Sequence, residues 1–232
     1  MADEIKRDKA AREMFLSVCL MRAEAAMDFS VPESPRSLKK SVRRLVETEL
    51  KPHDAAIEES GRIKPRALDA TRAFGFYGSN TPKRYDGLGL DMLGNCFVIE
   101  EMARAHIAYF YTYSMYVHIA SKAIELHGSD AQRQRWLPGL ASGRVLGCYA
   151  LTEEGAGSDA PALQTTAIRR NDSYVLNGAK RYITNAPVAD LFTIFAAQPE
   201  EGARARNSAF IVEKGAPGLR IGRFSARTYV CL

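Results

Sequence analysis

The sequence lacks a hydrophobic run long enough to cross a bilayer. The apolar run Met14–Met21 has eight residues, whereas a transmembrane helix needs about 20. Small residues follow this run, as in a secretory signal, but Asp3, Glu4 and Asp8 lie among the bases that precede it. We therefore expect no membrane partner, and a secretory or organellar signal stays open as the alternative.

Cysteine is scarce and scattered. The four cysteines form no Cys-x-x-Cys pair and no dense framework: Cys19, Cys96, Cys148 and Cys231. This spacing favours free thiols in a reducing compartment. We therefore expect a cytoplasmic protein.

Several motifs that carry chemistry are also missing. Gly87, Gly89 and Gly94 miss the dinucleotide-binding spacing, because Met92 stands where the third glycine should be. No Gly-Lys-Ser/Thr loop is present, and no Gly-x-Ser-x-Gly elbow surrounds Ser158. The histidines lack metal-ligand spacing, so we expect no metal site: His53, His106, His118 and His127.

The charge pattern does not indicate a nucleic-acid partner. The net charge is +5 and the pI is about 9.0, but acids accompany the bases, as in residues 6–12 and 43–49. Such mixed segments are typical of solvated faces. We therefore expect no nucleic-acid partner.

The first half of the chain has the signals of helices. Residues 37–52 place an apolar stripe on one helix face, and residues 63–78 have Pro65 near the start of a helix and Gly75 near its end. Asp91 is the expected N-cap of the next helix, and residues 129–143 predict a short helix that stops at Pro138. The stripe of the first helix consists of Leu38, Val42, Leu45 and Val46.

Tyrosines recur at helical spacing in residues 106–128. Tyr109, Tyr113 and Tyr116 would share one helix face. Packing in the core is one interpretation of this face. A helix that lines a ligand channel is the other.

After Gly143 the pattern changes to short β runs separated by turns. The predicted strands lie in residues 145–153, 163–170, 173–185, 190–198, 207–215 and 219–223. Asn177-Gly178 predicts a hairpin turn inside the third of these stretches. The fold class is therefore α+β, an all-helical N-terminal domain followed by a mostly antiparallel β domain, with a boundary near residue 145.

Residues 151–159, the glycine loop, follow the first of these strands. Strand alternation places Thr152 on one face and puts Lys180, Tyr182 and Thr184 together on the next hairpin arm. Thr152, Tyr182 and Thr184 would then suit a flat conjugated ligand. Gly155, Gly157 and Ser158 offer backbone and hydroxyl donors for a phosphate or pyrophosphate. An ordinary turn is the alternative for this loop. The adjacent Glu153 and Glu154 would diverge, which disfavours a cooperating acid–base pair.

Four stretches in this order resemble the acyl-CoA dehydrogenase family. They read "RYDGLGLDMLGNCFVIEEMARA", "AIELHGSDAQRQRWLPGLASGRVLGCYALTE", "LTEEGAGSDA" and "LNGAKRYITNA". The resemblance runs from about Met27 to Arg223 and implies a helical domain over 28–145, a β-barrel-like middle domain over 146–232 and an N-terminal extension over 1–27. Met27 as the natural initiator and an extra N-terminal helix are two interpretations of that extension.

The resemblance implies a flavoenzyme that uses FAD. In the family, a carboxylate base removes the α-proton of an acyl-CoA thioester and the β-hydrogen leaves as hydride to the flavin. An electron-transferring flavoprotein is then the acceptor, and full-length members are homo-oligomers. The implied cofactor-binding residues are Tyr149, Leu151, Thr152, Gly157, Ser158, Tyr182, Ile183 and Thr184, and Ser158 also contacts the CoA ester.

Two departures from the family pattern matter. Glu154 stands where the family usually has proline, which puts flavin affinity in question. The pattern fades after "PGLRIGR", so we expect the third domain, a helical bundle that carries the catalytic glutamate, to be absent. No catalytic residue is therefore assigned. The alternatives are a non-catalytic FAD or acyl-CoA-binding fragment that needs a partner, and an acyl-CoA oxidase or flavin monooxygenase.

Overall fold

The computed structural model describes residues 33–114, 119–199 and 205–222. The chain divides into two compact units, residues 1–36 and 37–232. In the first unit the described residues 33–36 form the start of helix α2 (Glu33–Leu45). The predictions for the extension 1–27, for Cys19 and Cys231, and for Tyr116 and His118 lie outside the described residues. The predicted boundary near residue 145 stays a prediction.

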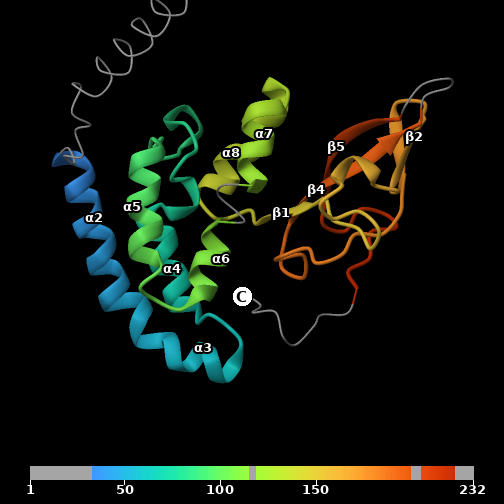
Figure 1. Ribbon diagram of the computed structural model, residues 1–232. Coiled ribbons are helices and arrows are strands. Elements are labelled where there is room, and N and C mark those ends of the chain that lie inside the picture. The colour runs from blue at the N-terminus through green and yellow to red at the C-terminus, as the bar shows by residue number, and fades with distance from the viewer. Residues whose placement is uncertain (1–32, 115–118, 200–204, 223–232) are drawn as a thin grey trace, which may run out of the picture. The chain divides into compact units, whose positions relative to one another are not determined.

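Helices come first along the chain and strands follow, as the colour order of Figure 1 shows. After α2 the chain forms a π-helical turn (Val46–Leu50), a 3-10 turn (Lys51–His53) and helix α3 (Asp54–Ser60). The predicted apolar stripe faces the core: Val42 and Val46 are fully buried, and Leu38 and Leu45 pack against the same cluster. None of the described helices is long and apolar enough to cross a membrane.

Local capping signals determine the next helices. Pro65 begins helix α4 (Pro65–Phe74), and Gly75 ends it with φ 82°, a left-handed conformation that glycine adopts without strain. Short 3-10 turns follow at Phe76–Gly78 and Lys83–Tyr85. Asp91 caps helix α5 (Met92–Met102), because its Oδ1 accepts a hydrogen bond from Gly94 N at 2.7 Å.

The remaining helices are α6 (Ile107–Ser114), α7 (Ser121–His127) and α8 (Asp130–Ala141). Ser129 and Gln132 form a capping box at the start of α8. The prediction that this helix stops at Pro138 was wrong. It continues to Ala141, and Ser142 N donates to the carbonyl of Pro138 at 3.1 Å.

The strands form one mixed sheet. They are β1 (Gly147–Ala150), β2 (Thr166–Arg170), β3 (Ser173–Asn177), β4 (Leu191–Gln198) and β5 (Arg206–Glu213), with a 3-10 turn at Ala160–Ala162. β4 pairs antiparallel with β5, and β2 pairs antiparallel with β3. β4 also pairs in parallel with β1 over Gly147–Ala150 and with β2 at Thr166. The expected antiparallel pattern therefore holds for two of the four pairings, since β4 returns in the direction of β1 after a long connection.

The hairpin predicted at Asn177-Gly178 was wrong. β3 ends at Asn177, and residues 178–190 contain no strand. The hairpin of this region is β2–β3, whose turn includes Asn171 at φ 54°. Gly178 instead permits a close approach, because a Cβ there would lie 2.7 Å from the Cα of Thr165. Residues 219–222 likewise form no strand.

Candidate functional site

A buried carboxylate lies at the base of the glycine loop. Glu153 is 7% exposed, and its Oε1 accepts hydrogen bonds from Thr165 N at 3.0 Å and Thr165 Oγ1 at 2.6 Å. Its Oε2 accepts one from Gln164 N at 2.6 Å. These bonds tie the loop to the residues just before strand β2.

Lys180 completes the environment of this carboxylate. Its Nζ donates to Glu153 Oε1 at 2.6 Å and to the carbonyl of Leu151 at 3.0 Å. Burial by itself would raise the pKa of Glu153, but the bonds from Lys180, Thr165 and the two backbone N–H groups outweigh it and lower the pKa to about 2. Glu153 is therefore an ionised structural anchor and is unsuited to taking a proton near neutral pH.

A second layer of contacts joins the glycine loop to residues 180–185, the Tyr182 segment. Arg181 N donates to the carbonyl of Thr152 at 2.8 Å. The Arg181 guanidinium pairs with the Glu154 carboxylate and lies over the ring of Tyr182, 5.4 Å from its centroid. The two stretches singled out in the sequence are thus neighbours. Glu153 and Glu154 diverge as predicted, one inward to Lys180 and one outward to Arg181.

Tyr182 has an unusual backbone and an open ring. Its φ is 57°, which is uncommon for a bulky residue, and the residue is 82% exposed. The strand predicted for residues 180–184 was wrong, so Lys180, Tyr182 and Thr184 do not alternate along one face. A bend at Tyr182 presents the ring instead, while Lys180 points back to Glu153.

Apolar packing fixes the residues on either side of this junction. Leu151 packs with Ala156 and Leu163, whereas Ile183 packs against the cluster that contains Cys148. Tyr149 is half-buried, with its ring 4.7 Å from that of Phe195, and burial raises its pKa. Thr152 and Thr184 are half-buried. Among the predicted site residues, Tyr149, Leu151 and Ile183 are thus half-buried and pack on apolar side chains, whereas Gly157, Ser158 and Tyr182 are exposed.

The glycine loop has open space around its glycines. A Cβ at Gly155 or Gly157 would meet no heavy atom within 4 Å, and Ser158 is exposed. Neither glycine has a positive φ, so a turn conformation does not require them. Bare backbone at both positions would let a ligand approach the N–H groups closely.

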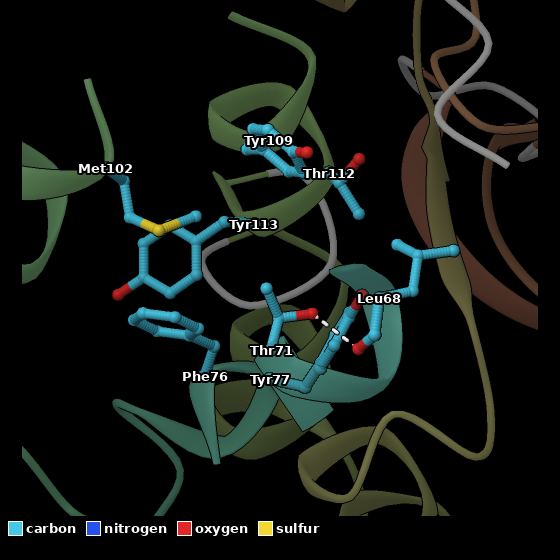
Figure 2. Close-up of a pocket in the computed structure, with 8 residues that line it drawn as sticks. All are labelled: Leu68, Thr71, Phe76, Tyr77, Met102, Tyr109, Thr112 and Tyr113. Carbon is cyan, nitrogen blue, oxygen red and sulfur yellow. Dashed lines mark hydrogen bonds between the residues drawn. The ribbon is translucent and has the colours of Figure 1, made fainter. Parts of the chain in front are cut away.

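The helical tyrosines face a small cavity. Figure 2 shows Tyr109 and Tyr113 of α6 above Thr71 and Phe76, with the Thr71 hydroxyl bonded to the carbonyl of Leu68 at 2.7 Å. The cavity has a volume of about 10 Å³, enough for roughly one water molecule. The Tyr109 hydroxyl donates to Leu50 O at 3.1 Å, and the Tyr113 hydroxyl lies 2.8 Å from Ser79 Oγ. Core packing is therefore the better interpretation of Tyr109 and Tyr113.

The sequence interpretation missed the residues that hold the site together. Glu153 was weighed only as half of an acid–base pair, and Lys180 only as a member of a strand face. Thr165 was not considered, and Gly178 was considered only as part of a hairpin turn, although it packs directly on Thr165. The sequence does not indicate that Glu153 and Lys180 are in contact, because they are 27 positions apart in the chain.

Comparison with known proteins gives the family. Residues 32–144 match the family model for the acyl-CoA dehydrogenase N-terminal domain, and residues 148–228 match the one for its middle domain. The short-chain-specific acyl-CoA dehydrogenase of Clostridium acetobutylicum is 36% identical over 197 residues, which cover 85% of this chain and 52% of the relative.

Two solved structures illustrate the likeness in fold. Butyryl-CoA dehydrogenase from Megasphaera elsdenii has a TM-score of 0.75 and 31% identity, over 83% of this chain and 51% of that one. An acyl-CoA dehydrogenase complexed with FAD from Bacillus anthracis has a TM-score of 0.73 and 33% identity, over 85% of this chain and 33% of that one. This chain spans about half the length of the curated relatives it matches first. Since the two family models together match most of its residues, the chain belongs to the acyl-CoA dehydrogenase family.

Proposed function

We propose that this chain binds FAD between the glycine loop and the Tyr182 segment and takes part in the α,β-dehydrogenation of an acyl-CoA thioester. The observation that carries the proposal is the junction of these two segments by Arg181 N and Lys180 Nζ. A related acyl-CoA dehydrogenase, from Bacillus anthracis, is described as complexed with FAD.

The chemistry of the exposed groups fits such a cofactor. Tyr182 offers an open aromatic surface to a flat ring system, and Thr152 and Thr184 offer hydroxyl groups. The space around Gly155 and Gly157 suits a pyrophosphate on backbone N–H groups, with Ser158 as a further donor to phosphate or to the CoA ester. Tyr149, Leu151 and Ile183 support these groups by packing.

FAD, when bound, would accept the hydride that leaves the β-carbon. The residues of this chain would orient the ring and hold the thioester end near Ser158. We assign no catalytic base among them, because Glu153 accepts four hydrogen bonds and its pKa is near 2. We further propose that an electron-transferring flavoprotein accepts the electrons, and that the protein is a homo-oligomer in the cytoplasm.

Flavin binding without turnover is the second candidate. It is favoured because Glu153, the buried carboxylate at the junction, is hydrogen-bonded to Thr165 and Lys180 and is not free to act as a base. An acyl-CoA oxidase or flavin monooxygenase would use the same junction, and consumption of oxygen without another acceptor would identify either.

The test is the visible spectrum of the purified chain with FAD, followed by anaerobic addition of acyl-CoA thioesters. Bound flavin that bleaches supports dehydrogenation, and bound flavin that stays oxidised supports the second candidate. Absence of flavin binding would contradict both. Gly157→Asp should abolish binding, because it adds bulk and negative charge in the open space of the loop. Ala55→Asp, an acid added on the exposed side of α3, is the matched control.

A further inference from the structure

Two stretches of chain converge on the Glu153 carboxylate of the glycine loop. It receives the N–H groups of Gln164 and Thr165 before β2, the Thr165 hydroxyl and the Lys180 ammonium. Lys180 in turn donates to Leu151 O, so the same two side chains span both sides of the junction. Glu153 and Lys180 are 7% and 9% exposed.

A contact of this kind has more effect on geometry than on net stability. The free energy lost when two charges leave water is about as large as the free energy gained from their attraction. A protein with an apolar pair of similar volume in the same place is therefore often equally stable. The directed hydrogen bonds, however, specify where each segment lies. The Gly178 backbone packs closely on Thr165, because an added Cβ would lie 2.5 Å from Thr165 Oγ1.

The ligand-facing groups are the ones that depend on this anchor. Tyr182 keeps a left-handed φ of 57° two residues after Lys180, and such a conformation costs free energy and persists only where its surroundings enforce it. Beside it, Arg181 N is held by Thr152 O at 2.8 Å. The Glu154–Arg181 pair is exposed and screened by water, so it restrains the same junction only weakly.

We propose that Glu153, paired with Lys180, is a positioning residue that couples the glycine loop to the Tyr182 segment, so that both take their ligand-facing arrangement together. The identity of the ligand as FAD rests on the proposed function. The coupling itself rests on the contacts described above and holds in the chain without FAD.

The coupling is tested first in the FAD-free chain by hydrogen exchange. The variant is Glu153→Gln/Lys180→Met, which removes both charges and therefore leaves no buried ion unpaired. We expect faster exchange in peptides that cover 151–157 and in peptides that cover 178–185, with helix α8 unchanged. Faster exchange in only one of the two segments would overturn the coupling.

The consequence for the ligand is tested by titration with FAD well below the unfolding temperature of each variant. If the arranged state falls to about a tenth of the population, the apparent Kd for FAD rises about tenfold. We expect Glu153→Gln alone to lose both stability and affinity. The double variant should regain stability but keep the weaker affinity, whereas a purely structural pair would restore both.

The matched control is Lys122→Met/Glu125→Gln. This pair has the same residue types and lies 2.9 Å apart on helix α7. It should leave the Kd for FAD and the exchange of both segments unchanged. Wild-type affinity in the Glu153→Gln/Lys180→Met variant would reject the positioning role. A wild-type chain that binds no FAD would reject the proposed function, and the exchange data would still decide whether Glu153 couples the segments.

Discussion

The Glu101 carboxylate on α5 is fully buried, yet it forms a two-point ion pair with Arg43 of α2. Arg43 Nε lies 2.8 Å from Glu101 Oε2, and Arg43 Nη2 lies 2.6 Å from Glu101 Oε1. Lys39 and Arg104 are further away, at 3.8 and 3.7 Å. The bond from Arg43 lowers the pKa of Glu101, so this helix contact keeps a charge inside the protein.

Arg43→Met should therefore destabilise the fold strongly. It removes the closest partner of the buried Glu101 carboxylate and leaves only the more distant Lys39 and Arg104, at 3.8 and 3.7 Å. Denaturant unfolding at neutral pH measures the loss. Arg66→Met is the control, because the Arg66–Glu49 pair is exposed and should contribute less than about 1 kcal/mol. Equal losses in the two variants would contradict the importance of the buried pair.

Glu153 predicts an acid-sensitive stability. Its pKa is about 2 in the folded chain, below the usual value of 4.5, so its contribution is complete above pH 4.5 and is lost as the pH falls toward 2. In that window only the unfolded chain binds this proton, which costs about 1.4 kcal/mol per pH unit. The free energy of unfolding should fall less in Glu153→Gln than in the wild type when the pH is lowered from about 5 to about 3. Parallel curves would reject this assignment.

Two glycines of the β part should respond in opposite ways to alanine. Gly178→Ala forces a Cβ within 2.7 Å of the Thr165 backbone, so we expect a loss of about 1–3 kcal/mol. Gly155→Ala meets open space and should change stability by less than about 0.5 kcal/mol. Thermal unfolding of both variants without FAD gives the comparison. A tolerated Gly178→Ala would mean that the close approach to Thr165 relaxes easily.

The two described cysteines should differ in reactivity. Cys96 is exposed, whereas burial raises the pKa of Cys148 to about 12. A thiol reagent at pH 8 should label Cys96 in the native chain and Cys148 only after unfolding. Peptide mass spectrometry identifies each site. Rapid native labelling of Cys148 would show that β1 opens readily.

Signals that act within a few residues were predicted well. Pro65, Gly75, Asp91 and Ser129 begin or end helices as their residue types indicate, because caps and φ preferences are local. The glycine loop and the Tyr182 segment are neighbours, as the sequence analysis expected, although the strand assumed for residues 180–184 in that argument is absent.

Features that depend on distant partners could not be predicted in the same way. Asn177-Gly178 has the sequence of a hairpin turn, but Thr165 demands a glycine there for close packing. On α5 the apolar Leu93 is 40% exposed, while the charged Glu101 is buried because Arg43 reaches it from α2. The parallel pairing of β4 likewise has no local signal, since its partner β1 is far back in the chain.

The parallel pairing of β1 with β4 also sets an order of assembly during synthesis. β2 and β3 are joined by a short turn and can form a hairpin as soon as they leave the ribosome. β1 is made earlier, yet its described pairing is with β4, and the bond from Leu146 N to Asp190 spans 44 residues. The strand that leads into the glycine loop can therefore complete its described pairing only after the residues of β4 have been made.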